Sequence, residues 1–265
     1  MIPVHVNTDI ILPQGYSEYE IDSDRDLEIT FSGTGKSEVF VRIVKCPNLR
    51  IRTFTGADAA VTYLFWNDCS AELKTDESHE VMRNGDLRIA YGECNQADTK
   101  RTSWVALRER GAHALVSSAS LVENRKETKM EVGNYAPHTL GEMKNFAVVL
   151  KGGKLFIDAI GKIVKGAYGS ESHQTSRALC FEDGQNSTIL PELLIDENDV
   201  QASHAMSIGR MDDEQLYYLR SRGLSERQSI MLMSTGYLMP VTEFINDEAL
   251  KEKLRAQMEE KIARL

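Results

Sequence analysis

The cysteines are the residues of this chain with the most reactive side chains, and their spacing limits what they can do. Cys46, Cys69, Cys94 and Cys180 include no C-x-x-C pair and no cluster with histidine at the spacing of a zinc site. Free cysteines are among the most frequently buried residue types. We therefore expect all four to be structural thiols inside the fold, and the sequence assigns them no further role.

No segment has the complete pattern of a nucleotide-binding or nucleophilic site. The GTGK sequence at 33–36 lacks the G-x-x-x-x-G-K-[ST] spacing of a phosphate-binding loop. The KGGK sequence at 151–154 is typical of a hairpin turn or of a corner between two strands. No nucleophile stands with its base in a recognisable catalytic motif. We expect no nucleotide site on this chain and no catalysis by the chain alone.

Short segments of alternating apolar and polar residues fill the region from Leu27 to Ile208 and must position any site there. They read as strands because the alternation has a period of two, and turn-forming residues separate them. They cover residues 27–31, 38–44, 49–54, 60–66, 87–91, 103–109, 113–122, 146–152, 154–164 and 178–181. No helical stripe is long enough for a βαβ crossover, so a sandwich, a barrel or a β-solenoid remains open.

The spacing of three cysteines favours the solenoid. Cys46, Cys69 and Cys94 recur at nearly equal intervals in the twenties, and each follows an apolar segment and precedes a turn. A repeat in the twenties is typical of one coil of a parallel β-helix, which contains short strands and their corners.

The pattern changes to helical after Gly209. Asp212 and Ser225 are predicted to cap two helices, with Gly223 and Pro240 as stop signals. A third helix is predicted from Asp247, with an apolar stripe at every fourth residue, namely Leu250, Leu254, Met258 and Ile262. We place a β domain at residues 1–210 and a helical domain at 211–265.

Composition excludes several classes of function. With 40 acidic and 31 basic residues the formal charge is −9, which disfavours electrostatic binding to nucleic acid or to an anionic membrane. No apolar run reaches the roughly 20 residues of a membrane span. The first residues lack the regions of a secretory signal, and four cysteines do not form a disulfide framework. We expect a soluble, cytoplasmic protein.

Four motifs follow one another near the end of the β region. They are H-x-x-x-R-x-L at 173–179, P-x-L-x-I at 191–195, D-V-x-A-S-H-A-x-x-I-G at 199–209 and D-D-E-Q-L-x-Y-L-x-S-R-G at 212–223. In this order they resemble the SufB/SufD family of iron–sulfur cluster assembly scaffolds, and the SufD members more than the SufB members. The segment upstream fits the family less distinctively.

The resemblance implies a right-handed parallel β-helix followed by a small C-terminal helical domain. It also implies that two subunits pair through the C-terminal end of the β-helix, as SufB with SufD or as two like subunits. A SufC ATPase subunit would dock on the C-terminal helices of each protomer. Whether the second subunit is a SufB-like paralogue or a second copy of this chain stays open.

The resemblance singles out His204. It aligns with the SufD histidine implicated in cluster formation at the subunit interface, so it is a candidate ligand for iron or for a transient iron–sulfur cluster. SufB members carry a cysteine in a Q-C-D context upstream, where this chain has Gln174, Thr175 and Ser176. The thiolate would then come from a SufB-like partner, although a homodimer with a relocated set of ligands also stays open. The alternative is that His204 only forms a structural hydrogen bond.

The first predicted helix is the candidate docking surface for SufC. Exposed aromatic and arginine side chains are common in protein interfaces, whereas Leu216 and Leu219 could serve only to pack the helix. The predicted partner-binding residues are Asp212, Glu214, Gln215, Tyr217, Tyr218, Arg220 and Arg222.

The predicted function is that of a non-catalytic scaffold subunit in a SUF-type iron–sulfur cluster assembly complex. The alternative from another class is a stand-alone β-solenoid enzyme that acts on carbohydrate, with paired carboxylates along a groove. A groove lined by Asp and Glu would favour this enzyme, whereas a pairing edge would favour the scaffold.

Overall fold

The protein is described by a computed structural model that covers residues 1–181, 186–210 and 212–263. Its main body consists of strands, most of them seven to eleven residues long. The strands are β1 (Ile2–Val4), β2 (Thr8–Ile11), β3 (Gly15–Asp22), β4 (Leu27–Gly33), β5 (Lys36–Lys45), β6 (Asn48–Thr55), β7 (Ala60–Asn67), β8 (Leu73–Val81), β9 (Asp86–Glu93), β10 (Thr99–Leu107), β11 (His113–Val122), β12 (Arg125–Asn134), β13 (Leu140–Val149), β14 (Lys154–Ile163), β15 (Ser170–Cys180), β16 (Asn186–Ile195) and β17 (Val200–Arg210).

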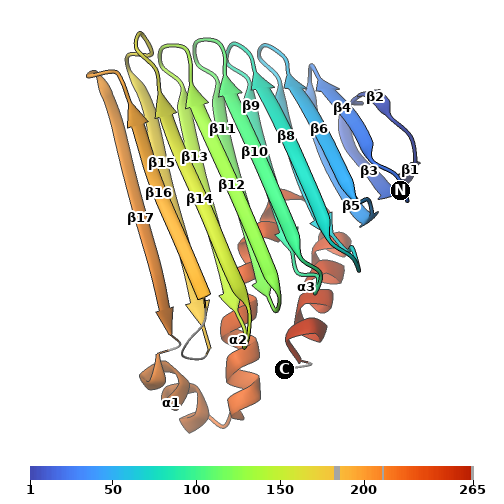
Figure 1. Ribbon diagram of the computed structural model, residues 1–265, viewed down its shortest axis with the longest axis vertical. Coiled ribbons are helices and arrows are strands. Elements are labelled where there is room, and N and C mark those ends of the chain that lie inside the picture. Colours follow the sequence, from blue (N-terminus) through green and yellow to red (C-terminus); the bar gives the residue numbers. More distant parts are fainter. Residues whose placement is uncertain (182–185, 211, 264–265) are drawn as a thin grey trace.

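The strands form two parallel sheets that face each other. The odd-numbered strands follow one another from β1 to β17 in one sheet, and the even-numbered strands from β2 to β16 form the other. Each strand therefore pairs with the strand two positions along the chain, and the chain coils from one sheet to the other (Figure 1). This arrangement is a parallel β-helix, so the prediction of a β-solenoid is confirmed.

The coil lengthens along the chain. Glu28 pairs with Arg50 near the N-terminus, whereas Lys154 pairs with Asn186 near the end of the coil, across a clearly longer stretch of sequence. The intervals between the first three cysteines are similar to the length of the early coils. Cys46 and Cys69 belong to the apolar interior of the coil, but Cys94 lies on the outside of the odd-strand sheet under the helices. All four cysteines are buried, as predicted.

The corners of successive coils repeat one backbone conformation. Asp58, Asn84, Gly111, His138 and Gly169 all have φ between 51° and 75° and precede strands of the odd-numbered sheet. The side-chain amide of Asn84 donates to Asp58 Oδ1 at 2.9 Å. A Cβ on Gly111 would lie 2.3 Å from Asn84 Oδ1, so this corner requires glycine for space as well as for its φ.

Three α-helices and one 3₁₀ helix follow the last strand. They are α1 (Asp213–Ser221), α2 (Glu226–Leu238), η1 (Met239–Phe244) and α3 (Glu248–Ala263). Asp212 caps α1, and Ser225 forms a capping box with Gln228 at the start of α2. Pro240 lies in the first turn of η1, where its missing N–H costs no helical hydrogen bond.

The helices from α2 onward pack against the outer face of the odd-strand sheet. The predicted stripe of α3 is buried there together with sheet residues such as Trp66 and Leu121. The connection also reaches the N-terminal half of the coil, because Asn246 donates to both carboxylate oxygens of Glu38 at 2.7 and 2.6 Å. The helical segment thus folds back along the sheet (Figure 1). The separation into domains at residue 210 stays a prediction.

Candidate functional site

The last strand of the odd-numbered sheet holds the predicted metal ligand. β17 pairs with β15 along its whole length and is the final strand of its sheet. In the described part of the chain its other edge has no partner strand, so it presents backbone N–H and C=O groups for pairing. Ten of its eleven residues are exposed, His204 among them. The candidate ligand therefore lies on an open sheet edge.

The two faces of β17 have different environments near His204. It pairs in register with Gln174, whose buried amide reaches across the coil to β16. The preceding residue, Ser203, points to the opposite face, where its Oγ lies 2.8 Å from His173 Nδ1. His173 Nε2 lies 3.1 Å from Glu171 Oε2. These contacts join β17 to β15 beside His204.

His204 does not belong to a cluster of metal-binding side chains in the described part of the chain. Among the described residues no group of three His, Cys, Asp or Glu side chains is placed to hold a metal ion. The nearest cysteine along the paired strand, Cys180, lies at the far end of β15 from Gln174, at a distance of roughly 20 Å. Burial raises the pKa of the Cys46 thiol, and raises those of Cys69 and Cys94 to about 12. These three side chains are therefore neutral thiols at physiological pH.

The predicted docking residues all lie on or beside α1, which has no buried residue. Tyr217 is 76% exposed and Tyr218 is 56% exposed. The guanidinium of Arg222 lies 5.1 Å from the ring centre of Tyr218, and Arg220 forms an ion pair with Glu226 at 3.6 Å. Asp212, Glu214 and Gln215 line a shallow groove between α1 and α2. The structure thus places these residues on one projecting element, at the lower end of the view in Figure 1.

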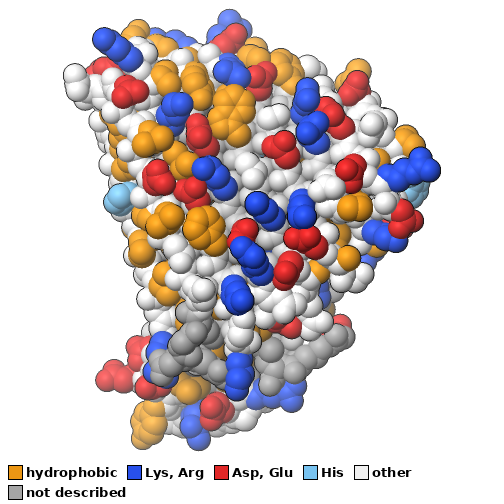
Figure 2. Space-filling model, viewed as in Figure 1, with side chains coloured by type: hydrophobic (Ala, Val, Ile, Leu, Met, Phe, Trp, Pro, Cys, Tyr) orange, Lys and Arg blue, Asp and Glu red, His pale blue; other side chains and the backbone are white. Residues whose placement is uncertain are grey.

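A groove on the outer face of the even-strand sheet bears on the carbohydrate-enzyme alternative. It has a volume of about 580 Å³, and its lining includes Glu28 and Asp76. Arg50 lies between these carboxylates and forms ion pairs with them at 3.5 and 3.6 Å. Figure 2 shows basic and acidic side chains intermixed over this face of the coil. Both carboxylates have Arg50 as an ion-pair partner, which does not favour their use as a general acid and a general base.

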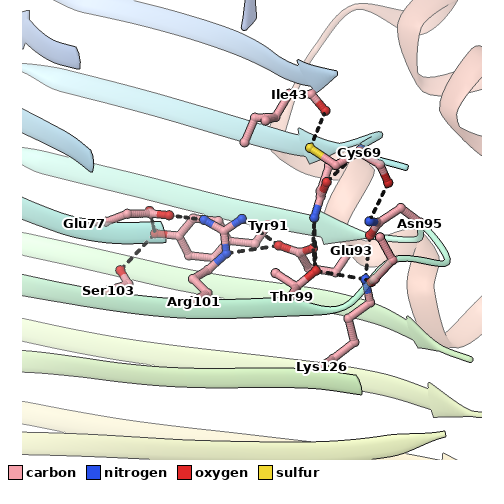
Figure 3. Close-up of polar contacts among 12 residues, drawn as sticks. Ile43, Cys69, Glu77, Tyr91, Glu93, Asn95, Thr99, Arg101, Ser103 and Lys126 are labelled. Carbon is pink, nitrogen blue, oxygen red and sulfur yellow. Dashed lines mark hydrogen bonds and ion pairs between the residues drawn. The ribbon is translucent and has the colours of Figure 1, made fainter. Parts of the chain in front are cut away.

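Sequence reasoning missed a charged network inside the coil. Arg101 contacts Glu77, and its guanidinium donates to Glu93 Oε1 at 2.6 Å (Figure 3). The same guanidinium lies over the ring of Tyr91, 4.1 Å from its centre. Lys126 Nζ donates to Asn95, Ala97 and Thr99 at 2.6 to 3.0 Å.

This network is balanced in charge and closed to solvent. Glu77, Glu93, Arg101 and Lys126 are each only 1% or 2% exposed. Burial alone would raise the pKa of Glu77, but the charge of Arg101 and contacts with His79 and Tyr91 outweigh it and lower the pKa to about 2. Burial lowers the pKa of Lys126. The apolar alternation of the sequence gives no signal over residues 73–81, because the inward positions of this strand include Glu77 and His79.

Comparison with known proteins agrees with this architecture. Residues 38–237 match the family model described as SUF system FeS cluster assembly, SufBD core domain. The chain belongs to the SufB/SufD family. The match begins within β5 and ends in α2, so it covers most of the β-helix and the first two helices.

Several curated relatives place the chain closer to SufD. It is 30% identical over 222 residues to the iron–sulfur cluster assembly protein SufD of Bacillus subtilis, covering 81% of this chain and 50% of that protein. It is 27% identical over 115 residues to SufD of Escherichia coli, covering 43% and 27%. A SufBD family protein of Mycobacterium tuberculosis is 23% identical over 264 residues, covering 97% and 30%. The chain is SufD-like and spans half or less of the length of these relatives.

No helix among residues 1–181, 186–210 and 212–263 is both long and apolar enough to cross a membrane.

Proposed function

We propose that this protein is a non-catalytic scaffold subunit of a SUF-type iron–sulfur cluster assembly complex. The observation that carries the proposal is the position of His204 on the open edge of a SufBD core. A second subunit that adds a strand at this edge would bring its own side chains beside the imidazole. Iron or a nascent cluster is then the cargo of the paired subunits.

The last coil supports pairing at this end. Four large apolar side chains of the two final strands are exposed, namely Leu190, Leu194, Met206 and Ile208. Exposed apolar side chains beside an unpaired strand edge are typical of a surface that another chain covers. We infer a SufB-like subunit as the partner, because it would supply the thiolate that the surroundings of His204 lack. A second copy of this chain is the other candidate.

We propose further that α1 binds a SufC-type ATPase. The helix and its C-cap combine two exposed tyrosines with two arginines, and α1 packs mainly against α2. Tyr and Arg are enriched at the centres of protein interfaces. Because α1 follows the pairing strand directly, a force on this helix would act next to the subunit interface.

Charge reversal on α1 tests the ATPase proposal. In the double variant Arg220→Glu, Arg222→Glu we expect the affinity for purified SufC, measured by isothermal titration calorimetry, to fall at least tenfold. The melting temperature should stay within about 2 °C, because the exposed pair contributes little to stability. Lys253→Glu, on the exposed side of α3, is the control and should bind normally. Unchanged affinity of the double variant would contradict docking on α1.

A further inference from the structure

The inward-facing residues of β15 form the last enclosed layer of the coil. Ser172, Gln174 and Ser176 are 0 to 3% exposed and pair in register with Ala202, His204 and Met206 of β17. Paired residues of parallel strands share a face, so His204 lies on the inward side of β17, one strand from Gln174. Beyond β17 no described strand continues the coil, and the imidazole stands at its open end.

The amide of Gln174 is held in one orientation, and its oxygen has no hydrogen-bond partner. Its Nε2 donates to the backbone oxygen of Glu192 at 2.7 Å, which fixes which end of the amide is the oxygen. Its Oε1 is buried and has no hydrogen-bond partner, and the same is true of Ser172 Oγ. A buried acceptor without a donor costs about 1–3 kcal/mol. Such an atom in a folded protein calls for an explanation.

The neighbouring strand makes room for this amide. A Cβ on Gly161 of β14 would lie 2.7 Å from Gln174 Nε2 and 2.3 Å from Ser172 Oγ. Glycine at this inward position therefore allows Gln174 to extend across the coil to Glu192. On the outer face, the Ser203 to His173 contact at 2.8 Å joins β17 to β15 one residue before His204.

The ring of His204 has a free N–H donor in its neutral form, and Gln174 has a free oxygen acceptor. A neutral imidazole carries one N–H donor and one lone pair, and only the lone pair binds a metal. Histidines that bind metals usually donate the other N–H to an oxygen acceptor, which selects the tautomer and the direction of the ring. No hydrogen bond of the His204 ring is found in the described part of the chain, and the unpartnered Gln174 Oε1 lies on the adjacent strand.

We propose that Gln174 is a positioning residue for His204: its Oε1 accepts the imidazole N–H, so that the lone pair of the other ring nitrogen points out of the open end of the coil. This inference rests on the proposed role of His204 as a ligand. It assigns a task to a buried side chain that the sequence motifs leave unexplained. The partner subunit would then meet an imidazole already in the tautomer that binds iron.

The tautomer of His204 can be measured without any metal. The full chain is labelled with ¹⁵N-histidine, and the ring nitrogens are observed by long-range ¹H–¹⁵N NMR at about pH 8.5, where an ordinary histidine is neutral. The His204→Gln variant assigns the signals. We expect one dominant tautomer in the wild type. In Gln174→Met, which keeps the length but lacks the acceptor, the ratio of tautomers should shift by roughly fivefold, equivalent to about 1 kcal/mol.

Two further variants separate positioning from a structural role. Gln174→Glu keeps an acceptor and loses the bond to Glu192, so it should retain the single tautomer. Ser176→Ala changes the next inward residue of β15 and should leave the ratio unchanged. If Gln174→Met folds and keeps the wild-type ratio, the proposal is wrong. If Gln174→Met does not fold, the test is Gln174→Glu, and a mixture of His204 tautomers in that variant would also show that the proposal is wrong.

The tautomer experiment and an iron-binding experiment can fail separately, so failure of the positioning role can be told apart from failure of the proposed function. Failure of His204 to bind iron in the paired complex would contradict the ligand role, even if the tautomer were fixed as expected. A mixed tautomer in the wild type would contradict positioning by Gln174, even if His204 bound iron.

Discussion

Arg101 is the single residue on which the charged interior of the coil depends most. Its guanidinium contacts two buried carboxylates, Glu77 on β8 and Glu93 on β9, which belong to the two facing sheets. Replacing it with an apolar side chain leaves two negative charges without a partner in a region closed to water. Removing one partner of a buried ion pair typically costs about 3–5 kcal/mol.

We therefore expect Arg101→Met to lower the free energy of unfolding by about 3–5 kcal/mol, measured by urea denaturation. Arg50→Met is the matched control, because Arg50 also lies between two carboxylates but is half exposed. The loss for Arg50→Met should be about 0–1 kcal/mol. Equal stability of Arg101→Met and the wild type would show that the interior network does not hold the coils together.

His113, at the surface of the odd-strand sheet, makes the stability of the fold depend on pH. Its ring lies 2.9 Å from Asp86 and 3.3 Å from Glu142, so it joins three neighbouring strands. The contact with Asp86, followed by that with Glu142, raises the pKa of His113 despite partial burial. The protonated ring is therefore favoured by folding. Its contribution is complete below the unfolded pKa of about 6.5 and is lost as the pH rises through the higher folded value.

We expect the melting temperature of the wild type to fall more between pH 6 and 8.5 than that of His113→Asn, measured by differential scanning fluorimetry. His5→Asn, a change at an exposed histidine near the N-terminus, should leave the wild-type slope intact. If the melting temperatures of His113→Asn and the wild type fall equally with pH, His113 is not the source of the pH dependence.

Single residues also show what the sequence could and could not indicate about the site. The motif around His204 could be recognised because it depends on residue identities alone. The burial of the cysteines could be predicted because free cysteines are generally buried in folded proteins. The buried charges could not be, since Glu77 and Arg101 favour exposure by type. The role proposed for Gln174 depends on which strand lies beside which, and only the register reveals it.

Among the elements, Gly92 on β9 leaves room for the ring of Trp66 between the odd-strand sheet and the helices. The two residues pair in register on β9 and β7, and Trp66 is fully buried under the helical segment. A Cβ on Gly92 would lie 2.3 Å from the indole ring. A larger residue at position 92 would push the ring toward the helices.

Gly92→Ala is expected to destabilise the fold by about 1–3 kcal/mol, as is typical of overpacking in a core. The loss can be measured by urea denaturation, with tryptophan fluorescence to report a changed environment of Trp66. Gly209→Ala is the control, because its Cβ would meet no atom within 4 Å. If Gly92→Ala unfolds at the same urea concentration as the wild type, the Trp66 ring moves aside without loss of stability, and the prediction is wrong.

Strands and helices were predicted well where apolar residues recur on one face or where a capping residue marks the helix start. Strands with apolar inward residues, such as β7 and β11, and helices with caps, such as α2, lie close to the predicted ranges. β8 and β12 were missed because the inward positions of β8 include Glu77 and His79, and those of β12 include Lys126. A period-two search for apolar residues cannot recognise such strands.

At the scale of the whole molecule, the two sheets of the coil have different surroundings. The middle strands of the odd-strand sheet are covered by α2, η1 and α3, while the outer face of the even-strand sheet carries intermixed charges. The amphipathic stripe of α3 predicted a buried face but not the surface that it would cover. That surface depends on apolar residues far away in the sequence, such as Phe40 and Leu64.

The C-terminal end of the coil is open in the described part of the chain, because β17 is the last strand of its sheet and is exposed. We propose that a second subunit completes a metal site at this end and that His204 is this chain's contribution to it.

Anaerobic reconstitution with iron and sulfide measures whether His204 contributes to a shared metal site. The chain is mixed with a SufB-like partner, and the visible absorption of the complex is compared for the wild type, His204→Ala and the control His5→Ala, with complex formation verified by size-exclusion chromatography. We predict that all three pair with the partner and that only His204→Ala loses most of the cluster absorption. Equal absorption of the paired wild-type and His204→Ala complexes would contradict the account.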